Sequence, residues 1–294
     1  MKTFKFESRA EFKAYVKEHG YVFDGNLDFG GCEWLTGREL PDGLEANTIW
    51  FVGCESLCVL PKNIKADKLT LVRCNKIIRL PKCMMVCSLA VKDCSGIISI
   101  PNISKCDFAF VRRCSSIKEV KISPNCQLEI EDLPNLKKIT TPLSLKVFVV
   151  RDCDSLSEIT SKIVASLIDI ESNKALKELP NGVECANVEI FDCPKLQALP
   201  DIEADMLDIE GCEALPFSQF LKHPILENHG FGVWYNPKRG YMISVGGSGF
   251  TEDDYIKECK NINGEQTAAA YLEAGILAIS KFKQWREERK KTFH

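Results

Sequence analysis

A repeat of about 20 residues constrains this chain more than any other feature. One position, which we call position zero, recurs at intervals of 19 to 22 residues. Cysteine fills eight of its ten copies, which are Cys32, Cys54, Cys74, Cys94, Cys114, Leu133, Cys153, Asn173, Cys193 and Cys212. A fixed period of this length is the signature of stacked structural repeats, so the chain is expected to form a solenoid.

Apolar residues accompany position zero at fixed offsets. Positions −5, −3 and +3 are apolar in every copy, and in five copies a Leu-Pro or Ile-Pro pair follows. Positions −5 and −3 alternate with polar residues, which predicts one short strand per repeat with its apolar side inward. Because one such unit cannot bury its own apolar side, neighbouring units are expected to stack into a parallel sheet. Proline lacks a backbone donor, so the proline segments suit the extended back of each turn.

The cysteine at position zero is interpreted as a packing residue. We expect its side chain to turn inward where the strand ends, and to offer a weak hydrogen bond to the bending backbone. Asn173 fits the same role in its own copy.

The repeat frame resembles the leucine-rich repeat. The matching pattern is I/L-x-A-x-x-L-x-L-x-x-C/N-x-x-L-x-x-L-P, and it covers residues 26–216. Its short length and closing Leu-Pro resemble the repeats of bacterial effectors. The resemblance implies an α/β-type solenoid with a curved parallel sheet. It also implies that the concave face binds a protein, and that the chain is a bacterial or phage effector or inhibitor.

The two ends depart from the repeat. Residues 1–25 are predicted to be an N-terminal cap with one helix, because Ser8 and Glu11 have capping-box spacing and Gly20 ends the pattern. Residues 217–294 are predicted to form a small α+β domain. It would contain a hairpin over 231–245, a short helix from Thr251 or Glu252 to about Lys260, and a long helix from Glu265 to about Lys290.

Composition narrows the functional classes. The net charge is −3, and no apolar run approaches the roughly 18 residues of a membrane span. Residues 1–25 carry five Lys/Arg against four Asp/Glu and residues 217–294 carry eleven against nine, which leaves a net charge of −6 for the repeats. The N-terminus has no apolar signal-peptide core, so we expect a cytoplasmic protein with reduced cysteines, although export without such a signal stays open.

The solvent-facing positions of the repeats are the predicted binding residues. They lie four, two or one residues before position zero, and they change from aromatic and basic to acidic along the chain. The predicted partner-binding residues are Trp50, Val72, Arg73, Lys92, Phe110, Arg112, Arg113, Glu129, Glu131, Arg151, Asp169, Glu171, Glu189, Phe191, Asp208 and Glu210. Exposed aromatic residues among charges are typical of protein-binding surfaces, and the carboxylates favour a partner with a basic surface over nucleic acid or membrane.

Other chemistry has weaker support in the sequence. Cys83, Cys87 and Cys106 could hold zinc, but Cys106 lies in a column of small residues at position −8, so we expect packing and no metal site. The glycine-rich segment 245–250 lacks the Lys-Ser/Thr of a phosphate-binding loop and is expected to be a flexible loop. His223 and His229 have no evident nucleophile nearby. We therefore predict no catalytic residue and no cofactor.

Two alternatives to a binding scaffold stay open. One is an enzyme that uses Cys259 in the C-terminal region, as a ubiquitin ligase would. The other is a structural or assembly protein that self-associates through this region.

Overall fold

The computed structural model describes residues 1–103, 105–121, 123–140, 144–160, 162–215, 231–262 and 264–292. The chain divides into two compact units, Met1–Thr160 (unit 1) and Ser161–His294 (unit 2). Together the units contain about ten turns of parallel β-solenoid, which confirms the predicted stacking of repeats. Every apolar side chain at positions −5, −3 and +3 is buried, as the periodicity indicates.

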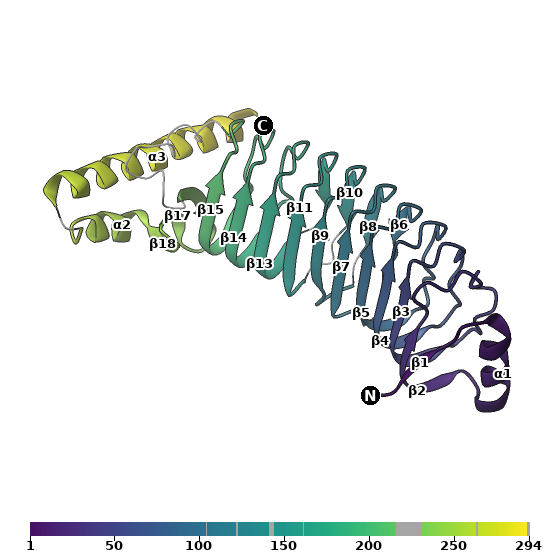
Figure 1. Cartoon of the computed structure of the whole chain (residues 1–294). Helices are drawn as coiled ribbons and strands as arrows, with labels where there is room; N and C mark the ends of the chain where they lie inside the picture. Colours follow the sequence, from purple (N-terminus) through teal and green to yellow (C-terminus); the bar gives the residue numbers. More distant parts are fainter. Residues whose placement is uncertain are drawn as a thin grey trace. The chain divides into compact units, whose positions relative to one another are not determined.

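Unit 1 carries two parallel sheets. The main sheet has the order β1-β2-β3-β4-β5-β7-β9-β11, and Figure 1 shows these strands side by side. A second sheet with the order β12-β10-β8-β6 runs along the backs of four turns, and it was not predicted. The main strands are β1 (Thr3–Lys5), β2 (Val22–Asp28), β3 (Glu45–Val52), β4 (Lys65–Val72), β5 (Met85–Lys92), β7 (Phe108–Arg112), β9 (Gln127–Glu131) and β11 (Val147–Arg151), and the back strands are β6 (Ser99–Ile100), β8 (Glu119–Lys121), β10 (Lys138–Thr140) and β12 (Glu158–Thr160).

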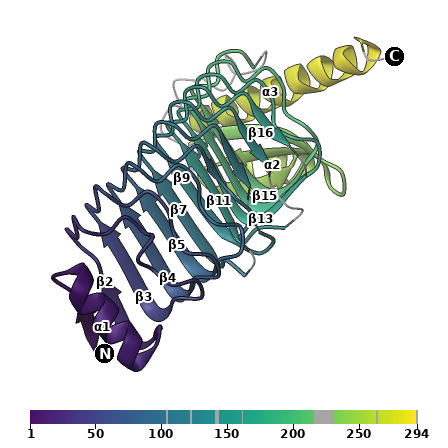
Figure 2. The same ribbon diagram turned by 90° about the vertical axis from the view of Figure 1, so that its right-hand side faces the viewer.

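The N-terminal end of unit 1 contains the predicted helix. Helix α1 (Arg9–His19) begins where the Ser8 hydroxyl accepts a hydrogen bond from the Glu11 amide at 3.2 Å, and Gly20 ends it with a φ of 80°. Figure 2 shows α1 at the β1–β2 end of the main sheet. Phe12 of the helix meets Phe29 of the first turn at 5.7 Å between ring centroids. Strand β2 begins at Val22, so the first turn overlaps the predicted cap.

A left-handed residue precedes position zero in all ten copies. The backbone φ at position −1 lies between 50° and 69° at Gly31, Gly53, Arg73, Asp93, Arg113, Asp132, Asp152, Ser172, Asp192 and Gly211. This conformation ends the main strand, and it turns the next side chain into the interior. The amide of the position −1 residue donates to the next turn, as in Gly53 N to Val72 O at 2.8 Å, so the ladder of hydrogen bonds continues through the bend.

The buried residue at position zero bonds to the carbonyl that the bend exposes. Seven of the ladder cysteines place Sγ 3.2–4.0 Å from the carbonyl oxygen two residues earlier. Asn173 does the same with its amide, whose nitrogen donates to Glu171 O at 2.9 Å. These contacts agree with the predicted packing role. An S–H···O bond is weak, and here it supplements the backbone hydrogen bond that the same carbonyl accepts in most turns.

Unit 2 joins three solenoid strands to a small α+β region. Strands β13 (Ile163–Glu171), β14 (Val183–Phe191) and β15 (Ile202–Glu210) are parallel and in register. The remaining elements are an antiparallel sheet of β16 (Phe231–Asn236), β17 (Gly240–Val245) and β18 (Ser248–Thr251), followed by α2 (Glu252–Cys259) and α3 (Glu265–Thr292). The predicted hairpin and both predicted helices are therefore confirmed.

The antiparallel sheet packs against the backbone of β15. Asn236 Nδ2 donates to Ala204 O at 3.1 Å, and the Ser244 hydroxyl donates to Leu207 O. A Cβ atom at Gly249 would lie 1.8 Å from Asp205 O, so only glycine allows this approach. Gly246 and Gly247 form the tight turn between β17 and β18, and residues 248–250 of the glycine-rich segment lie in β18, so the expectation that segment 245–250 is a loop was wrong.

Helix α3 has an outer face that contains an exposed aliphatic residue. The side chain of Ile276 is 41% exposed. The buried face instead uses Ala274, Ala278, Ile279 and Phe282. Gly275 lies under the ring of Tyr255, where a Cβ atom would come within 2.2 Å of the ring. Because α2 needs this close contact, the buried face of α3 contains small residues.

Replacing Asp152 tests the left-handed turn. Asp152 is exposed and has a φ of 54°. A β-branched residue tolerates this conformation poorly, whereas asparagine adopts it readily. Asp152→Val is expected to lower the free energy of unfolding by about 1–2 kcal/mol, and Asp152→Asn to leave it within about 0.5 kcal/mol. Urea denaturation of both variants measures this, and equal midpoints would contradict the assignment.

The pH dependence of stability tests the buried thiols. Burial raises the pKa of the Cys153 thiol from 9.0 to about 12. The folded chain therefore keeps a proton that the unfolded chain loses above pH 9, so the stabilisation is complete below pH 9 and declines as the pH rises towards 12. The free energy of unfolding of the wild type should fall by up to about 1.4 kcal/mol per pH unit more than that of Cys153→Ser, whose hydroxyl does not titrate. If the free energies of unfolding of the wild type and of Cys153→Ser change with the same slope between pH 9 and 11, the raised pKa of the Cys153 thiol is refuted.

Candidate binding faces and a pocket

The outward side chains of the main sheet in unit 1 form a regular grid. We call its part on four strands the unit 1 face. In register, its rows are Thr48, Lys68, Ser88 and Phe108; Trp50, Thr70, Ala90 and Phe110; and Val52, Val72, Lys92 and Arg112. The predicted residues Trp50, Val72, Lys92, Phe110 and Arg112 are thus brought together on adjoining strands. Phe108 was missed, because the prediction considered only positions −4, −2 and −1.

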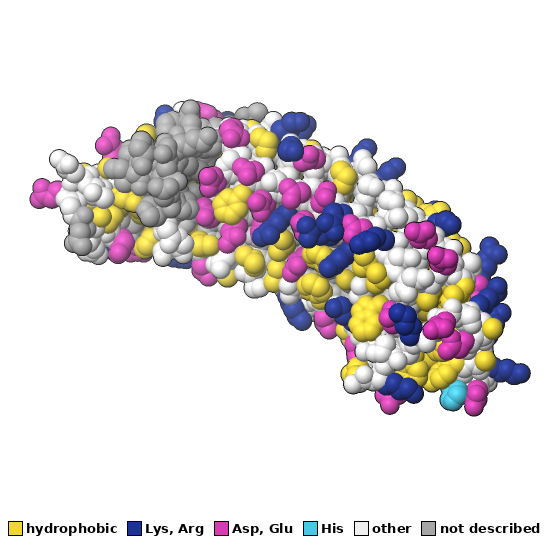
Figure 3. Space-filling view, in the orientation of Figure 1, with side chains coloured by type: hydrophobic (Ala, Val, Ile, Leu, Met, Phe, Trp, Pro, Cys, Tyr) yellow, Lys and Arg dark blue, Asp and Glu magenta, His cyan; other side chains and the backbone are white. Residues whose placement is uncertain are grey.

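Several basic side chains of this region already have partners. Lys92 Nζ lies 4.7 Å from the centroid of the Phe110 ring. Arg112 pairs with Glu131 at 3.0 Å, and Arg113 makes two hydrogen bonds of 2.6 and 3.0 Å to Asp93. Figure 3 shows Lys and Arg side chains gathered over this part of the sheet. The charge on this surface is therefore partly neutralised by neighbouring turns.

Arg73 and Arg113 differ from their predicted placement. Both were expected on the strand face, but both occupy the left-handed position that follows the strand. Their side chains therefore start from the rim of the face, and Arg113 reaches along it to Asp93 of the preceding turn. The predicted residues Glu129 and Glu131 lie on β9, and Arg151 ends β11, so all three belong to unit 1. Gln127 Nε2 donates to Glu129 at 2.7 Å.

The remaining predicted residues form a second face on unit 2. We call it the unit 2 face. Asp169, Glu189 and Asp208 lie directly opposite one another on β13, β14 and β15, and the neighbouring row is Glu171, Phe191 and Glu210. Five carboxylates therefore surround one phenyl ring on three adjacent strands. Asp169 is 4% exposed, and Glu210 is the most open of the six.

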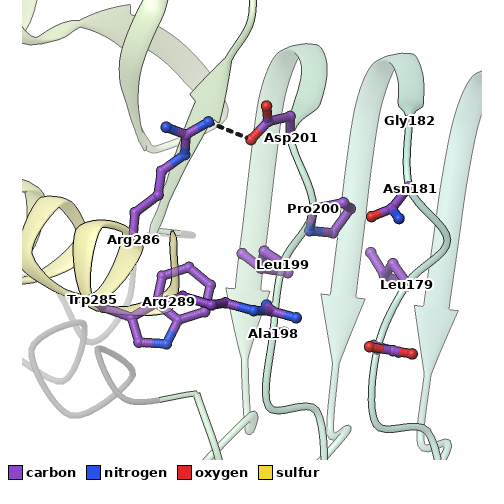
Figure 4. Close-up of a pocket in the computed structure, with 11 residues that line it drawn as sticks. Leu179, Asn181, Gly182, Ala198, Leu199, Pro200, Asp201, Trp285, Arg286 and Arg289 are labelled. Carbon is purple, nitrogen blue, oxygen red and sulfur yellow. Dashed lines mark hydrogen bonds and ion pairs between the residues drawn. The ribbon is translucent and has the colours of Figure 1, made fainter. Parts of the chain in front are cut away.

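A pocket of about 670 Å³ lies within unit 2, and sequence reasoning missed it. Figure 4 shows Trp285, Arg286 and Arg289 of α3 on one side and the backs of two solenoid turns on the other. Leu179, Ala198, Leu199 and Pro200 provide apolar walls, and Asn181 and Asp201 are polar lining groups. Arg286 closes one end by pairing with Asp201 at 2.7 Å and stacking on Tyr235 at 3.7 Å. These contacts join residues up to 85 positions apart, so no local pattern could indicate them.

The thiols considered for chemistry are not brought together. Cys106 is buried, whereas Cys83 and Cys87 are exposed. In the described part of the chain, no three His, Cys, Asp or Glu side chains form a metal-binding group. Cys259 is 3% exposed, and burial raises the pKa of its thiol. A reactive cysteine needs the opposite shift and access to solvent. His223 and His229 lie outside the described residues.

No known protein family, curated protein or solved structure matches this chain in our comparisons. Of the helices that the structure describes, none combines the length and the apolar composition that crossing a membrane requires.

Thiol labelling tests the burial of Cys259. Cys58, Cys83 and Cys87 are exposed, and the other twelve of the fifteen cysteines are buried. Iodoacetamide at pH 8 should add three adducts to the native protein within minutes and fifteen after unfolding, as counted by intact mass. Peptide mapping identifies the sites. Labelling of Cys259 at the rate of Cys58 would contradict its burial and would favour the enzyme alternative.

Substitution of Arg286 tests how α3 is held in unit 2. Its side chain is 16% exposed, and it makes both the ion pair with Asp201 and the stacking contact with Tyr235. Arg286→Ala should cost about 1–3 kcal/mol, because it removes both contacts. Hydrogen exchange should show faster opening of α3. Asp201→Asn keeps the stacking and should have a smaller effect, and equal effects would refute the role of the ring.

Proposed function

We propose that this chain is a non-enzymatic protein-recognition scaffold of the leucine-rich-repeat type, whose main-sheet faces bind partners. The observation that carries the proposal is the unit 2 face, where five carboxylates surround Phe191 in register. The partner is a protein with a basic surface. As an effector or inhibitor, such a scaffold would act by covering that surface.

The carboxylate rows place like charges next to one another. Residues directly opposite on neighbouring strands lie roughly 5 Å apart, and like charges at that separation are destabilising. Asp169, Glu189 and Asp208 place three acidic side chains in one such row. A soluble surface needs charge of both signs, not one sign gathered around an aromatic ring. Lys or Arg side chains of a partner would offset the repulsion, and Phe191 offers a ring face for a cation.

The enzyme alternative has less support from the described residues. A thiol nucleophile has to be exposed and partly ionised near neutral pH. Cys259 is buried, and the pKa of its thiol is raised by burial. The ladder cysteines bond to backbone carbonyls in the interior. We therefore assign the ladder cysteines and Cys259 to packing and propose no catalytic step.

Charge reversal on the unit 2 face tests the proposal. The test variant carries Glu171→Lys, Glu189→Lys and Glu210→Lys, and it spares the buried Asp169. A matched control carries Asp253→Lys, Glu258→Lys and Glu273→Lys on α2 and α3. These substitutions change the net charge by the same amount as those of the test variant. Both are compared with the wild type by affinity capture from a lysate of the source organism, after circular dichroism has shown equal folding.

A protein captured by the wild type and the control but lost by the test variant would support the scaffold. The affinity of that partner should fall at least about tenfold with the test variant, and it should weaken with added salt. Capture of the same proteins by all three chains, or of none by any, would refute a binding role for the unit 2 face.

A further inference from the structure

The unit 1 face has a composition opposite to that of the unit 2 face. None of its twelve positions on β3, β4, β5 and β7 is acidic, although acidic residues make up 41 of the 294 residues of the chain. Three of the twelve are aromatic, namely Trp50, Phe108 and Phe110, and each is partly exposed. Val52, at the end of β3, is 39% exposed. Exposed aromatic and aliphatic side chains in one contiguous area indicate a surface that is covered in a complex.

The middle row of the face leaves space for a partner's side chain. Trp50 and Phe110 are separated by Thr70 and Ala90, which have short side chains. Three strand spacings place the two rings about 14 Å apart. A large apolar side chain over Thr70 and Ala90 would therefore contact an aromatic ring on either side.

Three cations around this row have no ion pair. Arg112 and Arg113 are engaged by Glu131 and Asp93. In contrast, no described carboxylate lies within ion-pairing distance of Lys68, Arg73 or Lys92. Lys68 and Arg73 are exposed, and Lys92 rests against the Phe110 ring. Lys68 and Lys92 lie in the rows on either side of the middle row, and Arg73 follows β4 at the rim of the face. Carboxylates of a partner can therefore reach them while its apolar side chains contact the rings.

We propose that the unit 1 face binds an extended, acidic protein segment that carries large apolar side chains. The inference rests on the proposed protein-binding role, but it names a second surface and a partner chemistry opposite to that of the unit 2 face. Asp28 lies beside Trp50, and Glu129 lies beside Phe110, so a carboxylate bounds the row at each end. A continuous phosphate backbone would meet repulsion there, whereas a peptide can place neutral residues at these points.

A peptide-display experiment tests this assignment. A library of random 12-residue peptides is selected on the wild-type chain and sequenced. The selected pool is then passed over three variants, each first shown to melt as the wild type does. They are Trp50→Ser with Phe110→Ser, Lys68→Glu with Lys92→Glu, and the control Glu189→Lys with Glu210→Lys on the unit 2 face. If the aromatic variant fails to fold, the charge variant is sufficient for the comparison.

The proposal predicts a class of peptides that is lost on both unit 1 variants and kept on the control. These peptides should have a net negative charge and at least one Leu, Ile, Phe or Trp. A synthetic peptide of this class should bind at least about tenfold more weakly to the Lys68→Glu, Lys92→Glu variant in fluorescence anisotropy. No enriched class, an enriched class without acidic residues, or displacement by a 20-residue oligothymidylate would each overturn it.

The two functional tests can fail independently. The peptide selection depends on residues of unit 1, and the lysate capture depends on carboxylates of unit 2. If the selected peptides are lost only on the unit 2 control, the scaffold proposal stands and the unit 1 assignment is refuted. If charge reversal on the unit 2 face does not change the captured proteins, but acidic peptides that bind the unit 1 face are selected, the proposed basic partner of the unit 2 face is refuted instead.

Discussion

Every turn of this solenoid depends on one bend, in which a left-handed residue is followed by a buried side chain. In nine of the ten copies, all but Leu133, that side chain carries a hydrogen-bond donor. The left-handed residue ends the main strand, and its amide continues the ladder to the next turn. The donor, a thiol or the Asn173 amide, bonds to the carbonyl two residues earlier. In most turns this carbonyl also accepts the position −1 amide of the preceding turn, so the donor adds a second hydrogen bond to it. Cysteine suits this position because it is small, tolerates burial and still donates.

Because the bend fixes the backbone, the outward side chains of the main sheet are free to vary. The side chains at positions −6, −4 and −2 point away from the core, and all of them except Ala90 and Asp169 are at least partly exposed. The chain uses this freedom differently in its two units. The unit 1 face combines aromatic rings with Lys and Arg, and the unit 2 face gathers carboxylates around Phe191. Two faces of opposite charge on one scaffold suit two contacts with different chemistry, either on one partner or on two.

The sequence was sufficient for features that repeat or that act locally. The period of 20 residues predicted the stacked turns, the inward apolar columns and the role of position zero, and capping residues such as Ser8 located the helices. Long-range and conformational features were not predictable. Arg73 and Arg113 were predicted to be strand residues, because nothing in the sequence indicates that an arginine adopts the left-handed conformation. The Arg286–Asp201 contact joins distant segments. Gly249 was predicted to lie in a flexible loop, because the sequence does not show that the backbone of Asp205 packs against it.

Substitution of Asn173 is the most direct test of the donor at position zero. Asn173 is fully buried, and its amide donates to Glu171 O. Asn173→Cys and Asn173→Ser keep a donor, whereas Asn173→Ala matches serine in size and has none. Chemical denaturation should show that Asn173→Ala is less stable than Asn173→Ser by about 1 kcal/mol, since alanine cannot donate the hydrogen bond to the Glu171 carbonyl. Equal stability of the serine and alanine variants would contradict the account, because the ladder would then require only a small side chain.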